Sequence, residues 1–270
     1  MLAHRSEDPV TLRARLYLQA VLGAMPLLPE VDPFAERLVT TGRPGACLLS
    51  VKNGPGAGLL FDGEAIHRVE ADHPHPECRL GFRDCAGLNR FFEGSLTLPV
   101  VHGLFRRPGL PLRLAGLLLR LKAVMEPGPT ATLSSRQAQA YLLLNFAVVT
   151  QAVPFLAETL PAVRDHLAAG PAGLLVLTVD EHRCPQPLGL RFWVQVLEDG
   201  RAAAGLVVPS RPANAEVRFA NPATAVRNLR QEEIPQAAVN RGGIRVAGST
   251  PLADSVNAVF AWLARLLPAR

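Results

Sequence analysis

Cysteine and lysine are both scarce in this chain of 270 residues. The cysteines are four in number: Cys47, Cys78, Cys85 and Cys184. They are too few for a secreted scaffold held by disulfides, and none forms the Cys-x-x-Cys pair of a zinc ribbon or thiol redox site, so we expect buried, reduced thiols. Lys52 and Lys122 are the only lysines beside 26 arginines. We interpret this bias as coding composition, so the net charge of +5 by itself says little about partners.

An uninterrupted hydrophobic run of the length that crosses a membrane is also missing. The longest apolar stretch, Tyr141 to Leu160, is interrupted by polar residues and by Pro154, whereas a spanning helix needs about 20 nearly uninterrupted apolar residues. The N-terminal region carries Glu7 and Asp8 and leads to no cleavage site of small residues. We therefore expect a soluble, cytoplasmic protein.

The two halves of the chain repeat one order of sequence features, at an offset of about 139 residues. Each half has a strand-like apolar run, Ala46 to Val51 in the first and Leu174 to Val179 in the second. A second apolar run follows in each and closes on Asp-Gly, at Asp62 and at Asp199. A short helical pattern comes next. The shared order predicts two units of the same fold.

Glycine pairs and terminal helical patterns extend this repeat. Gly103 and Gly109 precede an amphipathic pattern that ends at Met125, and Gly242 and Gly248 precede one that ends near the C-terminus. This spacing predicts that Gly103 and Gly242 stand at equivalent strand starts. We expect an N-terminal unit over residues 1–128, and a helical linker with a C-terminal unit over residues 129–270. We expect that linker to be kinked or broken at its prolines, 154 and 161.

The second half, Gly189 to Pro268, resembles the sterol carrier protein type-two family of lipid-carrier domains. The resemblance is carried by LRFWVQVLEDG, PANAEVRF, ATAVRNL and the ending GGIRVAGSTPLADSVNAVFAWLARLL. The first half, Ala46 to Met125, is similar through FDGEAIHRV, PECRLGFRD, LNRFFEG and GLFRRPGLPLRLAGLLLRL. The resemblance implies an α+β protein of two tandem units joined by a helical linker. Each unit would be a five-stranded, mostly antiparallel sheet covered by helices on one face.

The same resemblance implies an apolar tunnel between sheet and helices. The tunnel would take a fatty acyl chain, an isoprenoid or quinone-type tail, or a sterol, without catalysis and without a cofactor; similar single-unit domains assist quinone biosynthesis in bacteria. Candidate lipid-binding residues are the large apolar side chains that share a helix face: Leu88, Phe91, Phe92, Leu117, Leu121, Val226, Leu229, Val256, Val259, Phe260 and Leu263. Ordinary core packing is the alternative for each of them.

The stretch from Gly103 to Met125 is basic and contains no acidic residue. Its charges are Arg106, Arg107, Arg113, Arg120 and Lys122. Leucines occupy the other side of the expected helix, a composition typical of helices that lie on an anionic membrane surface. A solvated face is the alternative. Aromatic residues make up only 6% of the chain and none interleaves with these charges, so we expect no nucleic-acid partner.

Other candidate sites are weaker. Prolines surround His73 and His75, so we expect a solvated loop there and no metal. The glycines from Gly54 to Gly58 precede a second strand-like run, which favours a hairpin turn over a phosphate-binding loop. Ser249 or Thr250 stands where a helix should begin, as an N-cap.

Three functions therefore follow from the sequence, in descending order. The first is a non-enzymatic carrier that presents a lipid, with reversible contact to an anionic membrane. The second is an interaction or scaffold module whose cavities are closed. The third is an enzyme that uses His67 or His102. It ranks last because single histidines near strands are more often structural residues. The sequence sets no oligomeric state.

Overall fold

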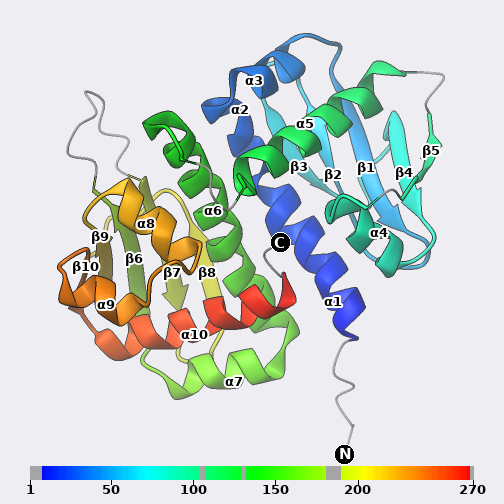
Figure 1. Ribbon diagram of the computed structural model, residues 1–270. Coiled ribbons are helices and arrows are strands. Elements are labelled where there is room, and N and C mark those ends of the chain that lie inside the picture. The colour runs from blue at the N-terminus through cyan, green and yellow to red at the C-terminus, as the bar shows by residue number, and fades with distance from the viewer. Residues whose placement is uncertain (1–7, 96, 104–106, 129–131, 181–189, 268–270) are drawn as a thin grey trace, which may run out of the picture. The chain divides into compact units, whose positions relative to one another are not determined.

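A computed structural model describes residues 8–95, 97–103, 107–128, 132–180 and 190–267 (Figure 1). The chain forms two compact units, Met1–Pro129 and Thr130–Arg270. Each unit contains one five-stranded sheet and helices, which makes the protein α+β.

The sheet of the first unit has the strand order β3-β2-β1-β4-β5. Its central strand β1 pairs parallel with β4, and the other pairs are antiparallel. All but one residue of β1 are buried, because both of its neighbours and the helices cover it. The strands are β1 (Gly45–Val51), β2 (Gly56–Phe61), β3 (Ile66–Glu70), β4 (Cys78–Phe82) and β5 (Val100–His102). The predicted hairpin between antiparallel β1 and β2 is confirmed: Gly54 lies in the turn, and Gly56 and Gly58 belong to the first residues of β2.

The helical layer of the first unit begins irregularly. Helix α1 (Pro9–Leu16) runs directly into a π-helical turn, η1 (Tyr17–Val21), and a 3-10 segment, η2 (Leu22–Leu27). These two segments contact β2 and β3, respectively. The remaining helices of this unit are α2 (Leu28–Val31), α3 (Pro33–Thr40), α4 (Cys85–Phe92) and α5 (Gly109–Met125).

The second sheet repeats the topology of the first. Its order is β10-β9-β6-β7-β8, and its single parallel pair joins β6 to β9, so β6 to β10 correspond in turn to β1 to β5. The strands are β6 (Gly173–Val179), β7 (Leu190–Val196), β8 (Ala202–Gly205), β9 (Ala215–Phe219) and β10 (Ile244–Gly248). The predicted class, a five-stranded and mostly antiparallel sheet with helices in each unit, is confirmed.

A long apolar helix, α6 (Ser135–Thr159), packs on the second sheet through β7 and β8. It begins with a capping box at Ser134 and continues through Pro154, so the helix is not broken at that proline, whereas the expected break at Pro161 is confirmed, because α6 ends at Thr159 and the next helix begins at Pro161. In the part of the chain that is described, α6 alone is long and apolar enough to cross a membrane, and 72% of its most apolar window is buried. The other helices are α7 (Pro161–Ala169), α8 (Pro222–Leu229), α9 (Pro235–Asn240) and α10 (Thr250–Leu266). Ser249 caps α10, as predicted.

Glycine geometry corrects the predicted alignment of the two units. Gly103 follows β5 and Gly248 ends β10, and both have positive φ, +85° and +78°. A Cβ on Gly103 would lie 2.1 Å from the carbonyl oxygen of Glu77, and one on Gly248 would lie 2.3 Å from that of Asn214. These two glycines are therefore the equivalent pair, whereas Gly242 precedes its strand. The sequence spacing misled because α9 occupies the connection before β10, while no helix precedes β5 among the described residues of the corresponding segment.

Candidate functional site

The candidate lipid-binding residues of the first unit lie on α4 and α5. Leu88, Leu117 and Leu121 are buried, whereas Phe91 and Phe92 are half-buried. The Phe92 ring stacks on that of Tyr17, with centroids 4.9 Å apart and planes nearly parallel. Aromatic packing thus joins α4 to the π-helical turn η1, and side chains of the protein itself fill the space beside Phe92.

The candidate residues of the second unit lie on α8 and α10. Val226, Val256, Val259 and Leu263 are buried, and the remaining two, Leu229 and Phe260, are half-buried. Both helices contact α6. On α6 itself, the Phe146 ring packs against those of Phe192 and Phe219, at centroid distances of 5.1 and 5.7 Å. These three rings therefore pack together between α6 and the sheet, and contact of the candidate residues with a lipid stays a prediction.

Two depressions on the described surface lie at sheet ends, away from all these residues. One, of about 600 Å³, is lined from Gly173 and from the β7–β8 turn, including Asp199 and Arg201. The other, of about 540 Å³, is lined by Pro76, Glu77, Arg79, His102 and Gly103. Both are open and partly polar, so neither has the character of an apolar tunnel.

Arg113 is a buried residue, which corrects its assignment to a membrane-facing surface. Only 8% of it is exposed, and its guanidinium donates hydrogen bonds to the carbonyl oxygens of Leu38 (2.5 Å), Val39 (2.6 Å) and Arg43 (3.1 Å). The first two carbonyls belong to the last turn of α3, which has no intrahelical donors for them. The guanidinium carbon also lies 4.5 Å from the ring centroid of Phe61. Burial lowers the pKa of Arg113 from its ordinary value.

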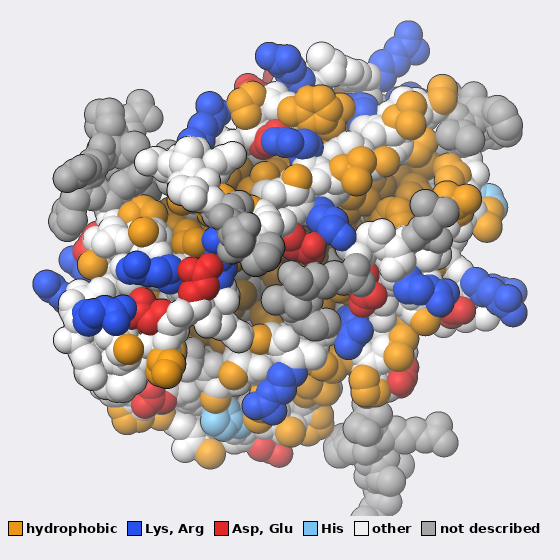
Figure 2. Space-filling view, in the orientation of Figure 1, with side chains coloured by type: hydrophobic (Ala, Val, Ile, Leu, Met, Phe, Trp, Pro, Cys, Tyr) orange, Lys and Arg blue, Asp and Glu red, His pale blue; other side chains and the backbone are white. Residues whose placement is uncertain are grey.

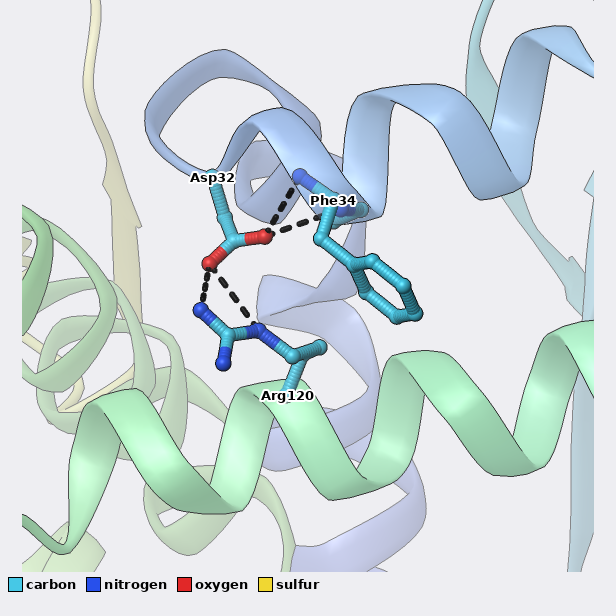
Figure 3. A network of polar contacts seen from close by, with 4 residues as sticks. Asp32, Phe34 and Arg120 are labelled. Carbon is cyan, nitrogen blue, oxygen red and sulfur yellow. Dashed lines mark hydrogen bonds and ion pairs between the residues drawn. The ribbon is translucent and has the colours of Figure 1, made fainter.

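Arg120 binds the opposite end of the same helix (Figure 3). Asp32 is the N-cap of α3, where one carboxylate oxygen accepts hydrogen bonds from the backbone N–H groups of Phe34 and Ala35, at 3.0 and 2.9 Å. The other carboxylate oxygen accepts hydrogen bonds from Nε and Nη2 of Arg120. Burial alone would raise the pKa of Asp32, but the hydrogen bonds from Arg120, Ala35 and Phe34 outweigh it and hold that pKa below its ordinary value. Arg113 and Arg120 together hold α5 against α3 at both ends.

Two of the remaining basic residues of this segment, Lys122 and Arg107, also bind groups of the first unit. Lys122 donates a hydrogen bond to the carbonyl oxygen of Glu93 at 3.0 Å and pairs with the carboxylate of Glu126 at 3.7 Å. Arg107 donates one to the carbonyl oxygen of Pro44. Arg106 lies outside the described residues. The sequence placed these charges along one basic segment, but it gave no sign that Arg113 would bind backbone carbonyls of α3 or that Arg120 would bind its N-cap Asp32.

We expect the Asp32→Asn substitution to destabilise the first unit by about 1 kcal/mol at pH 7, because the cap acceptor remains while the ion pair is lost. The folded pKa of Asp32 is lowered, so its contribution is complete above the ordinary value of 3.8 and is lost as the pH falls through the lowered folded value. The difference between parent and variant should shrink below pH 3.8. Hydrogen exchange of peptides from α3, measured by mass spectrometry between pH 7 and pH 3, checks this; a difference that persists unchanged in acid contradicts it.

An apolar surface on α5 is the feature that the sequence analysis missed. Leu112 and Leu119 are 71% and 70% exposed, and Ala115 and Ala123 are exposed beside them on the same side of the helix. In Figure 2, hydrophobic side chains gather over this helix. We call these four residues the α5 stripe. Their spacing of three or four residues is the sequence signal that could have revealed this surface. The signal was hidden because leucines also occupy the buried side of α5.

The two histidine candidates, His67 and His102, lie on opposite edge strands of the first sheet, β3 and β5. His67 pairs with Asp62 at 2.6 Å on an exposed turn, where backbone hydrogen bonds from Ala65 and Glu64 and one from His67 lower the pKa of Asp62 to about 2. His102 is exposed at the sheet edge. Among the described residues, no group of three or more His, Cys, Asp or Glu side chains could hold a metal ion.

Cys47 and Cys78 are buried neighbours, in register on parallel β1 and β4. A hydrogen bond between the two thiols and burial raise the pKa of Cys47 above its ordinary value, so this thiol stays protonated. Cys85 is half-buried, and all three thiols are free. Cys184 lies outside the described residues.

Comparisons with known proteins give structural likenesses only. No protein-family model matches the chain, and no curated protein sequence matches it. A sterol carrier protein domain 2 from Helicoverpa armigera is similar over 46% of this chain and 88% of that one, at 14% identity and a TM-score of 0.34. A possible sterol carrier protein from Thermus thermophilus is similar over 44% and 85%, at 19% identity and the same TM-score. A sec-alkylsulfatase from a Pseudomonas species is similar over 66% of this chain but 23% of its own, at 10% identity and a TM-score of 0.30.

Proposed function

We propose that the protein is a non-catalytic lipid carrier that holds an apolar tail between the helices and the sheet of its first unit. The tail is a fatty acyl chain, an isoprenoid or quinone-type chain, or a sterol-like ring system. No catalytic residue and no cofactor take part, because transfer of an apolar tail from water or membrane to protein needs no covalent step.

One observation carries this proposal. The helical cover of the first sheet loses regular α-helical geometry over Tyr17–Leu27, where it contacts β2 and β3, and this irregular stretch begins at the ring that stacks on Phe92. Helical irregularities of this kind occur frequently at functional sites. A tail that displaces Tyr17 from Phe92 would enter between the helical layer and the sheet at this point.

Transfer of such a tail from water to this site is energetically favourable. Each methylene group that leaves water for an apolar interior contributes about 0.8 kcal/mol, so a chain of about ten carbons outweighs the loss of one aromatic stack of about 1 kcal/mol. Ordering of the ligand and separation of the helices reduce this gain.

The second candidate function, an interaction or scaffold module with a closed interior, is favoured for the second unit. There α6 is regular along its 25 residues, and Phe146 fills the space between helix and sheet. We propose that this unit serves mainly as a structural module of the chain and not as a second carrier.

We further propose a cytoplasmic location. Two free thiols in register on neighbouring strands suit a reducing compartment. The membrane that supplies the tail is met transiently. Because Arg113 and Arg120 are committed to α3, that contact does not depend on them.

A tryptophan reporter tests the lipid site. The native tryptophans, Trp193 and Trp262, belong to the second unit, so the Phe92→Trp substitution places a third indole at the proposed entry. Titration with oleate or with a short prenyl alcohol should shift the emission of this variant to shorter wavelength, because the tail would take the place of Tyr17 and shield the half-buried indole from water.

Phe34→Trp is the matched control. Phe34 belongs to the same unit but is 52% exposed on α3, outside the proposed site, so its emission should stay unchanged. The parent protein supplies the background of the native indoles. Equal responses of both variants, or none together with the absence of stoichiometric lipid in native mass spectra, contradict lipid carriage and favour the scaffold.

A further inference from the structure

Arg68 on β3 carries hydrogen-bond donors that no acceptor uses. Its Nε and Nη2 are enclosed from water, and neither donates a hydrogen bond within the described part of the chain. The carboxylate of Glu70 lies 3.0 Å from Nη2, but the two groups form an ion pair without hydrogen-bond geometry. Buried donors in folded proteins nearly always have an acceptor, so this exception needs an explanation.

The register of the sheet places Arg68 on the face that the helices cover. Arg68 pairs with Leu59 of β2, which shares its face of that strand with Phe61. The ring of Phe61 lies against the guanidinium of Arg113 from α5, so the helical layer covers this face. The 3-10 segment η2 contacts β3 itself. Arg68 therefore lies beside the irregular stretch at which the lipid site is proposed.

The second unit indicates that the fold does not require an arginine at this place. Arg68 belongs to the row of paired residues that ends beside Gly103. In the second sheet, the row that ends beside the equivalent Gly248 has Ala204 at the corresponding place on β8. There α6 packs directly on β8. The guanidinium is thus a feature of the first unit alone.

The unused edge of Arg68 has the shape that binds a carboxylate. Nε and Nη2 lie on one side of a guanidinium and can donate two parallel hydrogen bonds to a planar anion. The same two nitrogens of Arg120 donate to the carboxylate of Asp32 (Figure 3). We propose that Arg68 binds the carboxylate of a fatty acid whose acyl chain occupies the lipid site under the helical layer. This inference rests on the proposed lipid carriage and selects the fatty acid from the ligands named there.

The strand order sets the course of the acyl chain. Strands β2 and β1 separate β3 from β4, and Phe82 of β4 contacts Phe91 beside Phe92. A chain anchored at Arg68 crosses three strand spacings, about 14 Å, to reach that side of the sheet. An extended acyl chain spans such a distance, so the carboxylate and the entry at Phe92 lie at opposite ends of one site.

Glu70 is the competitor for this guanidinium. Its side chain is 64% exposed, whereas that of Arg68 is 26% exposed. Without a fatty acid, Glu70 neutralises the charge of Arg68 from the rim of the sheet. An exposed carboxylate can turn into water at little cost when a second carboxylate binds the enclosed nitrogens. Substitutions of the two residues should therefore act on fatty acid binding in opposite directions.

Partition of two labelled lipids tests the inference on the full chain. Radiolabelled oleate and oleyl alcohol, which differ only at the polar end, are offered from sucrose-loaded phosphatidylcholine vesicles in a buffer alkaline enough to keep oleate ionised. Sedimentation of the vesicles leaves in solution the lipid that the protein carries. The parent should carry oleate, and should carry oleyl alcohol less well.

Three variants complete the partition experiment. Arg68→Met should lower oleate carriage by about tenfold, because the charge-assisted hydrogen bonds are lost, while carriage of oleyl alcohol is kept or rises. Glu70→Gln should raise oleate carriage and leave that of oleyl alcohol unchanged. Arg79→Met is the matched control, since Arg79 is exposed on β4 and its replacement should affect neither lipid.

Thermal unfolding without lipid separates ligand recognition from a structural role. Arg68→Met should unfold at the same temperature as the parent or higher, because it removes buried donors that have no acceptor. An arginine that only supported the fold would lower the unfolding temperature when replaced.

Three results overturn the inference while lipid carriage stands. They are oleate carriage by Arg68→Met equal to that of the parent, equal losses of both lipids together with a lower unfolding temperature, and reduced oleate carriage by Glu70→Gln. A parent that carries neither lipid contradicts the proposed function as well. The failure of the carboxylate site and the failure of lipid carriage are therefore distinguishable.

Discussion

Substitution of Arg113 by methionine should lower the free energy of unfolding of the first unit by about 3 kcal/mol, because carbonyl oxygens that the guanidinium now satisfies would be left with poor access to water. Three carbonyl acceptors lose their donor, and Phe61 loses the cation over its ring. Methionine has a similar length and flexibility, so the loss reflects polar contacts more than volume.

Arg113→Lys and Arg90→Met complete this experiment. The lysine keeps the charge but not the forked geometry, so we expect an intermediate loss. Arg90 is exposed on α4, and its replacement should cost less than about 0.5 kcal/mol. Hydrogen exchange of peptides from α3 and β1 reports on the first unit separately from the second. Equal protection in Arg113→Met and Arg90→Met would show that the buried guanidinium is dispensable.

The Gly248→Ala substitution should destabilise the second unit by about 3 kcal/mol, and Gly103→Ala should destabilise the first by a similar amount. At each position the new Cβ would overlap a backbone carbonyl oxygen at 2.1 to 2.3 Å, and the positive φ adds about 1 kcal/mol of strain. A backbone oxygen cannot move aside as the end of a flexible side chain can.

Gly242→Ala is the matched control for these substitutions. Its φ is also positive, at +70°, but no atom lies within 4 Å of the position of its Cβ. We expect a loss of only about 1 kcal/mol there. Thermal unfolding and hydrogen exchange of peptides from β5 and β10 provide the measurement. A loss at Gly242 as large as that at Gly248 would contradict the corrected equivalence of Gly103 with Gly248.

Repetition in the sequence was a reliable guide to topology but a weaker guide to exact correspondence. Strand-like runs and Asp-Gly turns recur in both halves, and the two sheets have the same strand order. The sequence matched Gly103 with Gly242, whereas Gly103 is equivalent to Gly248, the second glycine of the other pair. The mismatch arises because α9 lengthens the connection before β10. Spacing along a chain counts residues, whereas equivalence depends on which strand each residue pairs with.

Helix faces were predicted better than the roles of the side chains on them. Leu88 and Val256 are turned inward, as the period of 3.6 residues requires. The same periodicity cannot say whether an inward face meets a ligand or other side chains. In the second unit Phe146 occupies that space through its contacts with Phe192 and Phe219, two residues that lie far from it in the sequence.

The sequence by itself determined the two-unit organisation of repeated strand-like runs and the amphipathic helices, because both follow from local order and periodicity, whereas the α+β class was implied by the family resemblance of the two halves. Only the tertiary structure decided what the charges of α5 do. Arg113 and Arg120 are seven residues apart on one face, which is equally compatible with solvent, a membrane or another helix. In the structure both arginines bind α3: Arg113 donates hydrogen bonds to carbonyls of its last turn, and Arg120 donates to its N-cap, Asp32. A buried guanidinium needs acceptors, and the fold alone brings these acceptors to it.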